Sequence, residues 1–253
     1  INKKSIIMSI KTTLIYSPNF DNNRRKNTQI KFIIFHYTGM RKETEAIKRL
    51  TSIQSQVSTH YFIKKNGEII TMVPDAYIAW HAGKSYWKKY KSLNKNSIGI
   101  EISNPGHEFG YKNFSKPQIK NLIKLSKYLM HKYNVKKNCF LGHSDISPDR
   151  KLDPGEKFPW DILAKNKIGI WHNFKKKKLI KLRRKNTSAN EKNSFMANLK
   201  KLGYSHKSLN RKNIRKNSKL LVRAFQRRYR GELINGKIDQ ESLLIIRKLI
   251  AKA

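Results

Sequence analysis

The stretch Lys31-Phe-Ile-Ile-Phe-His36, which continues as Tyr37-Thr-Gly39, is a short apolar run that ends abruptly in polar residues. A run of this length predicts a buried β-strand that leads into a loop. Two later runs, Ser97–Ser103 and Cys139–His143, have the same character. Each run brings one polar side chain that a protein core disfavours: His36, Glu101 and His143.

Helical and hairpin patterns alternate with these strands. Glu43–Ile53 has apolar residues at helical spacing. The runs His60–Lys64 and Ile69–Val73 flank Lys65-Asn-Gly67, and Asn-Gly between two strand-like runs is typical of a hairpin. Ser115-Lys-Pro-Gln118 matches a capping box, so a longer helix is expected to begin there. This alternation predicts an α/β domain with a mixed central β-sheet flanked by helices.

The pattern changes near residue 164, and three parts are expected: an α/β domain at 1–165, a basic linker at 166–193 and a helical domain at 194–253. Eight of the eleven residues in Lys175–Lys185 are basic. We expect this stretch to be an exposed linker, with a surface-docking strip as the alternative. The last part predicts a small three-helix bundle. Its expected helices are Phe195–Leu202, Ser218–Tyr229 and a segment capped by Asp239.

The 253 residues include 56 Lys and Arg against 16 Asp and Glu, so the formal net charge is +40. A polyanionic partner, such as an anionic cell wall or membrane surface, is one interpretation. Compositional drift in the source proteome is the other, because Lys and Asn are dense along the whole chain. There is no zinc-finger spacing, RNP motif or basic region followed by heptads, so we expect no nucleic-acid partner.

Cys139 is the only cysteine, which excludes a disulfide framework within the chain and a four-cysteine zinc site. Any metal must therefore be held mainly by His and carboxylate side chains. No apolar run is long enough for a membrane span or for a secretory signal core.

His36, His143 and Asp153 form a chemically reasonable zinc set. Ligand sites in α/β sheets gather at strand ends. Zinc accepts nitrogen and oxygen ligands in tetrahedral geometry, and a catalytic site leaves the fourth position for water. Spacing alone leaves a structural role open for each residue, since His36 is far from the other two in the sequence.

Two charged residues could serve chemistry beside such a metal. Glu101 lies among isoleucines, where burial without a partner is costly, although strand alternation also allows it to face solvent. Lys151 precedes Asp153 by two residues. If it is strand-like and points into the same cleft, its cation would stabilise an oxyanion; otherwise it is an ordinary surface lysine.

Eight co-linear motifs resemble the type 2 N-acetylmuramoyl-L-alanine amidases, most closely the AmiD/AmpD-like subgroup. The resemblance covers about residues 15–165. The motifs are Ser17–Arg24, Phe35–Gly39, Val57–Tyr61, Ala79–Gly83, Ser97–Glu101, Gly142–Pro148, Arg150–Gly155 and Phe158–Trp160.

The resemblance assigns roles to individual residues. It implies that Zn²⁺ is bound by His36, His143 and Asp153. It also implies that Glu101 activates the attacking water and that Lys151 stabilises the transition state. Expected substrate contacts are His81, Trp80 and Tyr37, while His60 is expected to be structural. Thr59 stands where phage relatives have a catalytic tyrosine, which favours the glutamate-based mechanism.

The C-terminal part resembles the three-helix peptidoglycan-binding domain of wall hydrolases, over about residues 194–253. The amidase resemblance of residues 15–165 implies the function: hydrolysis of the amide between N-acetylmuramic acid and L-alanine, in peptidoglycan or in anhydro-muropeptides. The appended domain favours the cell envelope or periplasm, with the cytoplasm as the alternative. A monomer is expected. Two rival interpretations are a non-catalytic recognition protein on the same fold and a basic nucleic-acid-binding protein.

Overall fold

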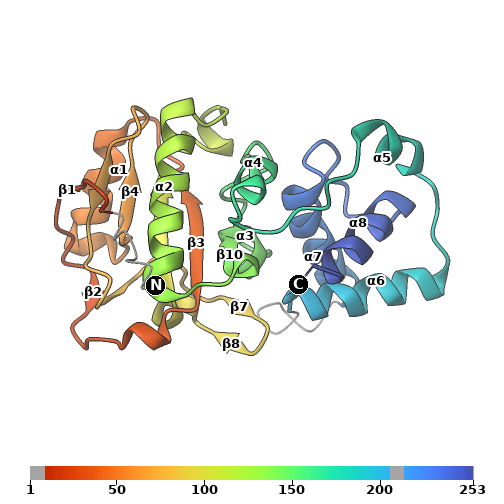
Figure 1. Ribbon diagram of the computed structural model, residues 1–253, viewed down its shortest axis with the longest axis horizontal. Coiled ribbons are helices and arrows are strands. Elements are labelled where there is room, and N and C mark those ends of the chain that lie inside the picture. Colours follow the sequence, from red (N-terminus) through yellow and green to blue (C-terminus); the bar gives the residue numbers. More distant parts are fainter. Residues whose placement is uncertain (1–8, 206–213, 253) are drawn as a thin grey trace, which may run out of the picture.

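The central sheet has six strands in the order β1-β5-β4-β9-β3-β10, in a computed structural model that describes residues 9–205 and 214–252 (Figure 1). Only β4 and β5 pair antiparallel; the other four pairings are parallel. The predicted mixed sheet and the predicted hairpin are therefore both confirmed. The strands are β1 Thr13–Leu14, β5 Ile69–Thr71, β4 Tyr61–Ile63, β9 Ser97–Ile102, β3 Phe32–Tyr37 and β10 Phe140–Gly142.

The register of the parallel strands brings the predicted polar residues to one edge of the sheet. His36 in β3 is the direct partner of Glu101 in β9. In the neighbouring pair, Gly142 of β10 is the partner of Phe35, so His143 follows at the same level. The carboxyl ends of parallel strands lie side by side, and this is where ligand sites form in such sheets.

Helices cover the sheet on both faces. Helix α1 spans Glu43–Thr51, and α2 spans Lys116–Tyr133. The predicted capping box at α2 is confirmed, because Gln118 N–H donates to Ser115 Oγ and Ser115 N–H donates to Gln118 Oε1. Leucines of α2 pack against one face of the sheet: Leu122, Leu125 and Leu129.

The opposite face is covered by the C-terminal helices. Phe32 and Ile34 of β3 and Leu141 of β10 belong to one apolar cluster with Phe195 and Phe225. Two short helices follow β10: α3 His143–Ile146 and α4 Trp160–Lys165. The C-terminal helices are α5 Lys176–Leu182, α6 Ala189–Leu202, α7 Ile214–Tyr229 and α8 Gln240–Ile250. In Figure 1 these C-terminal helices form a second body beside the sheet, and α3 and α4 lie between the two.

The C-terminal part differs from its predicted outline in three places, one of which is the start of α7 at Ile214, four residues before the predicted Ser218. Helix α6 begins at Ala189, six residues before the predicted start, because Ser188 and Glu191 form a capping box. The stretch expected to be an exposed linker contains α5, in which Leu179 is buried in the apolar cluster while the lysines stay exposed. Arg183, just after α5, donates to the buried carboxylate of Glu241, which fixes this segment to α8.

The remaining elements are short. Two small antiparallel pairs join β2 Phe20–Asp21 to β6 Ile78–Ala79, and β7 Tyr86–Trp87 to β8 Tyr90–Lys91. Single-turn 3₁₀ segments lie at Asn27–Gln29, Ile53–Ser55, Leu93–Asn96, His107–Phe109 and Lys137–Cys139. Across residues 9–205 and 214–252, none of the helices combines the length and apolar character that a bilayer crossing requires.

Candidate active site

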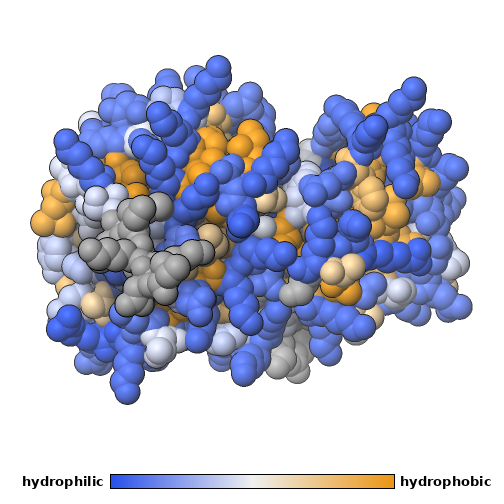
Figure 2. Space-filling view, in the orientation of Figure 1, coloured by the Kyte–Doolittle hydropathy of each residue, from blue (hydrophilic) through white to orange (hydrophobic). Residues whose placement is uncertain are grey.

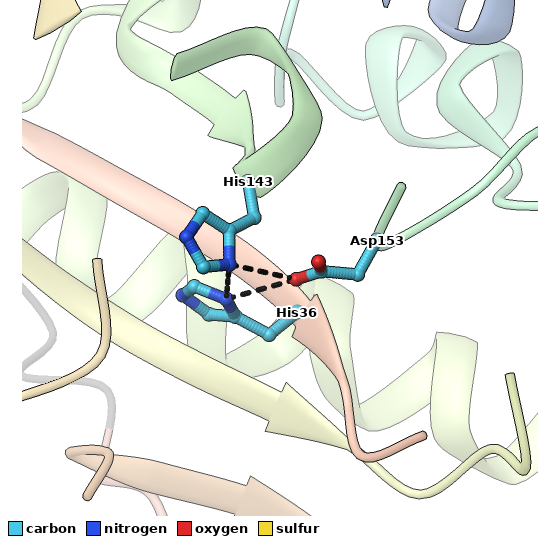
Figure 3. A group of neighbouring side chains, drawn as sticks. All are labelled: His36, His143 and Asp153. Atoms are coloured by element: carbon cyan, nitrogen blue, oxygen red, sulfur yellow. Dashed lines mark hydrogen bonds and ion pairs between the residues drawn. The ribbon is translucent and has the colours of Figure 1, made fainter. Parts of the chain in front are cut away.

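Three predicted ligands meet at the edge of the sheet. Figure 3 shows His36 from β3, His143 from the start of α3 and Asp153 from the following loop pointing toward one another. The two Nδ1 atoms are 2.9 Å apart, and each is 3.0 Å from Asp153 Oδ2. All three side chains are buried.

The outward nitrogens of both histidines have partners that define the proton positions. His143 Nε2 lies 3.1 Å from the carbonyl oxygen of Ala82, to which it donates. Ser97 Oγ–H donates to Leu93 O at 2.7 Å, so this hydroxyl must accept from His81 Nε2–H at 3.2 Å. A neutral imidazole has one N–H, so His81 Nδ1 accepts from His36 Nε2–H at 3.0 Å.

These hydrogen bonds leave the Nδ1 lone pairs of His36 and His143 directed at the carboxylate of Asp153. Burial, with the charge of His143, lowers the pKa of His36 to about 4, so this imidazole is neutral at pH 7. Burial raises the pKa of Asp153, but the neighbouring histidines outweigh it and keep the carboxyl ionised.

This arrangement fits a bound cation. Two lone pairs and a carboxylate oxygen about 3 Å apart repel one another unless a positive charge lies between them. The edges of 2.9–3.0 Å are close to the ligand–ligand edge of about 3.3 Å in a tetrahedron with bonds of about 2.0–2.1 Å. The second hydrogen bond of each imidazole is the usual support of a metal-bound histidine.

Glu101 lies within the same site. Its Oε2 atom is buried and has no hydrogen-bond partner among the described residues. Burial and the nearby Asp153 raise the pKa of Glu101 well above its ordinary value, against the opposing charge of Lys151. A carboxylate with a buried, unpartnered oxygen and a raised pKa is suited to accepting and returning a proton.

Lys151 reaches the site from an irregular segment, not from a strand. Its backbone N–H donates to Ser147 O, so it lies in the turn after α3. Lys151 therefore lines the cavity without belonging to a strand, because the segment between His143 and Asp153 consists of α3 and a turn.

One cavity of about 460 Å³ gathers every predicted site residue. Its lining includes His36, Tyr37, Trp80, His81, Glu101, His143, Lys151 and Asp153. Trp80 is held by a hydrogen bond from its Nε1 to Asp21 Oδ1 at 2.7 Å.

His81 belongs to the cavity lining and is hydrogen-bonded to His36. Only 9% of its surface is exposed, and both ring nitrogens bond within the protein. Gly99 of β9 leaves the space that the ring occupies, since a Cβ there would lie 2.4 Å from His81 Cγ. These bonds support the His36 ring, and the substrate contact expected from the sequence stays a prediction. His60 is fully buried and accepts from Gly99 N–H, as a structural residue would.

His107 and Glu156, which form a hydrogen-bonded group with Tyr37 beside the cavity, were not predicted from the sequence. Tyr37 Oη lies 2.8 Å from His107 Nδ1, and His107 Nε2 lies 3.0 Å from Glu156 Oε2. The His107 ring also stacks on Tyr111, with centroids 4.5 Å apart. The turn residues before His107, at 104–106, directly follow a predicted strand, and this position was the available clue.

Comparison with known proteins gives three results for the sequence. A family model described as N-acetylmuramoyl-L-alanine amidase matches residues 26–156. The amidase AmiD of Escherichia coli is 32% identical over 236 residues, covering 88% of this chain and 83% of that protein. The 1,6-anhydro-N-acetylmuramyl-L-alanine amidase AmpD of Haemophilus influenzae is 31% identical over 166 residues, covering 58% of this chain and 87% of that protein.

Solved structures show the same fold over most of the chain. Escherichia coli AmiD, in complex with anhydro-N-acetylmuramic acid-L-Ala-D-γ-Glu-L-Lys, matches with a TM-score of 0.76 at 31% identity, covering 88% of this chain and 90% of that one. Pseudomonas aeruginosa AmpDh3, in complex with anhydromuramic pentapeptide, matches with a TM-score of 0.75 at 28% identity, covering 91% and 96%. The chain therefore belongs to the N-acetylmuramoyl-L-alanine amidase family.

Proposed function

We propose that this amidase hydrolyses the amide between N-acetylmuramic acid and L-alanine with one zinc ion held by His36, His143 and Asp153. The observation that carries the proposal is the buried triangle of two imidazole Nδ1 atoms and one carboxylate oxygen beside Glu101. Family membership supports the reaction, and the His-His-Asp ligand set supports zinc.

Bound zinc would supply Lewis-acid polarisation of the amide carbonyl and would lower the pKa of a coordinated water. Glu101 acts as the general base: its free Oε2 accepts a proton from the attacking water and returns it to the departing amine of L-alanine. The raised pKa of Glu101 supports this role, because the group can hold that proton between the two transfers.

Lys151 stabilises the negative charge that develops on the carbonyl oxygen. Lys151 lines the cavity together with Glu101 and the ligand set. Tyr37 and Trp80 form cavity walls, where they contact the substrate. Glu101, Lys151, Tyr37 and Trp80 thus each have a role in the proposed reaction. His81 orients His36 through the hydrogen bond between their rings.

The substrate is peptidoglycan or an anhydro-muropeptide released from it. The AmiD and AmpDh3 complexes, which contain anhydromuramic peptides, support a muropeptide ligand. We propose residues 1–165 as the catalytic domain and 194–253 as a peptidoglycan-binding domain in a monomeric enzyme of the envelope or periplasm, with the cytoplasm as the alternative. The net charge of +40 supports contact with an anionic wall or membrane surface. Figure 2 shows hydrophilic residues over much of one face of the molecule, with hydrophobic patches between them.

The test is direct. The full chain, loaded with zinc, is incubated with purified sacculi and, separately, with an anhydro-muropeptide. New L-alanine amino termini are then identified by mass spectrometry. Release from either substrate is the expected result, and the ratio of the two rates distinguishes polymer from fragment. Binding of both substrates without cleavage would instead identify a non-catalytic recognition protein.

A further inference from the structure

The C-terminal helices cover the face of the sheet that carries the metal ligands. Strand residues alternate between faces, so Phe32, Ile34 and His36 of β3 point the same way. Phe32 and Ile34 pack in one cluster with the C-terminal Phe195 and Phe225. The ligand His36 therefore continues a row of side chains that the C-terminal helices bury.

One buried carboxylate connects this helical unit to the ligand His143. Asp145 lies in α3, two residues after His143, and is 1% exposed. Its Oδ2 accepts from Gly142 N–H at 2.8 Å, on the residue immediately before the ligand. The other bonds come from the C-terminal unit: Arg228 Nη1 donates to Oδ2 at 2.6 Å, and Tyr204 Oη–H donates to Oδ1 at 2.6 Å.

Arg228 also holds the strand that leads to the ligand. Its Nη2 donates to the carbonyl oxygen of Phe140, the first residue of β10, at 2.9 Å. Its guanidinium lies 3.8 Å from the ring centroid of Trp160. One side chain of α7 thus contacts β10, α3 and the start of α4. A planar guanidinium with several donors suits such a junction, and a lysine could not replace it.

The second ligand segment is attached to the same turn. Ser144 N–H donates to the backbone oxygen of Asp153 at 2.8 Å. The position of α3 therefore affects two of the three ligands, His143 and Asp153. A metal site of this kind depends on ligand geometry, and loss of supporting hydrogen bonds typically costs about 10–100-fold in metal affinity.

We propose that Asp145, Arg228 and Tyr204 are positioning residues for His143, so that the C-terminal unit is a structural part of the metal site. This inference rests on the proposed zinc site and adds to any role of the unit in wall binding. A tether raises only the local concentration of polymeric substrate. A support of the ligand turn also affects metal binding and the cleavage of small soluble substrates.

The test compares Arg228→Met and Tyr204→Phe in the full chain with two controls on α7, Arg223→Met and Tyr229→Phe. Arg223 is exposed, and Tyr229 makes no hydrogen bond to Asp145 in the described structure. Zinc affinity is measured by chelator competition. The geometry of the metal site is followed by the absorption spectrum of the cobalt-substituted protein. The fold of the metal-free protein is checked by circular dichroism.

We expect zinc affinity to fall about 10–100-fold in Arg228→Met and several-fold in Tyr204→Phe, with an altered cobalt spectrum. Both controls should stay within twofold of the parent protein. If Arg228→Met does not fold, Tyr204→Phe decides, since it removes a single hydroxyl.

Unchanged affinity and spectrum in folded Tyr204→Phe and Arg228→Met would overturn the inference, even if cleavage of sacculi fell. The outcome is separable from the proposed function, because metal binding is measured without any substrate. A parent protein that binds zinc but cleaves nothing would refute the function alone.

Discussion

Replacing Glu101 by glutamine separates chemistry from stability at this site. The substitution keeps the shape of the side chain but removes its capacity to accept a proton. Loss of a general base typically costs about 10²–10⁴-fold in rate, which is about 2.7–5.4 kcal/mol at 1.36 kcal/mol per factor of ten. We expect kcat to fall by a factor of about 10²–10⁴. Zinc content should be unchanged, because Glu101 is not one of the three ligand residues.

The same substitution should not weaken the metal-free fold. The pKa of Glu101 is raised in the folded protein, mainly by burial, so the folded state binds the proton more tightly than the unfolded chain does. Ionisation of Glu101 therefore lowers the free energy of unfolding as the pH rises above the ordinary pKa of 4.5. Glutamine has no such charge, so at pH 7 the free energy of unfolding should stay constant or rise.

The assay is the initial rate on a soluble muropeptide, with metal analysis and thermal unfolding of the same sample. Glu108→Gln is the matched control, because Glu108 is an exposed acid at the same cavity and loses the same charge. The control should retain its rate within about threefold. A Glu101→Gln protein that is fully loaded with zinc and within tenfold of the parent rate would refute the proposed base.

Four further outcomes follow from the geometry. Chelation should abolish cleavage and one equivalent of zinc should restore it; activity that survives complete metal removal, checked by elemental analysis, contradicts the zinc proposal. Lys151→Met should lower kcat about 10²–10³-fold with little change in KM, as measured by steady-state kinetics. Gly99→Ala should displace His81 and weaken zinc binding about 10–100-fold in a chelator competition. His107→Ala frees Tyr37 and should raise KM more than it lowers kcat, whereas equal values for variant and parent would exclude a role for His107.

Local patterns predicted the parts of the fold that local forces create. The apolar runs became β3, β9 and β10, and the capping residues Ser115 and Gln118 began α2 as expected. Parallel pairing then brought the polar strand ends together, which is a general property of such sheets. The convergence of the predicted ligands thus required only correct strands and their common direction.

The orientation of Glu101 could not be decided from alternation alone. A strand with one face in solvent would have allowed the carboxylate to point outward. Strand β9 instead lies between β3 and β4 near the centre of the sheet. Isoleucines of β9 pack under α2, while Glu101 on the other face opens into the cavity beside the ligands. Which face holds a cavity depends on packing between distant segments, and the sequence does not state it.

His81 shows the same limit in another form. Its motif suggested a substrate contact, yet its ring nitrogens bond to His36 and Ser97, residues that come from two different strands. Nothing in the spacing of these three residues indicates the chain of hydrogen bonds that they form. The clue in the sequence was Gly99, since a glycine inside a buried strand often marks a close approach by another group.

The alternation of β3 explains why a helix so distant in the sequence affects the metal site. Ile33 and Phe35 pack toward α2, whereas Phe32 and Ile34 pack with the C-terminal helices. His36 lies on the same face of β3 and lines the cavity. A catalytic ligand placed on that second face needs a cover that excludes water from its neighbours without filling the cavity. Arg228 meets this requirement because it bonds to α3 and β10 and is not one of the residues that line the cavity. Binding of the wall and support of the metal would then be two functions of the same helical unit, and substitutions at Arg228 and on its exposed surface should separate them.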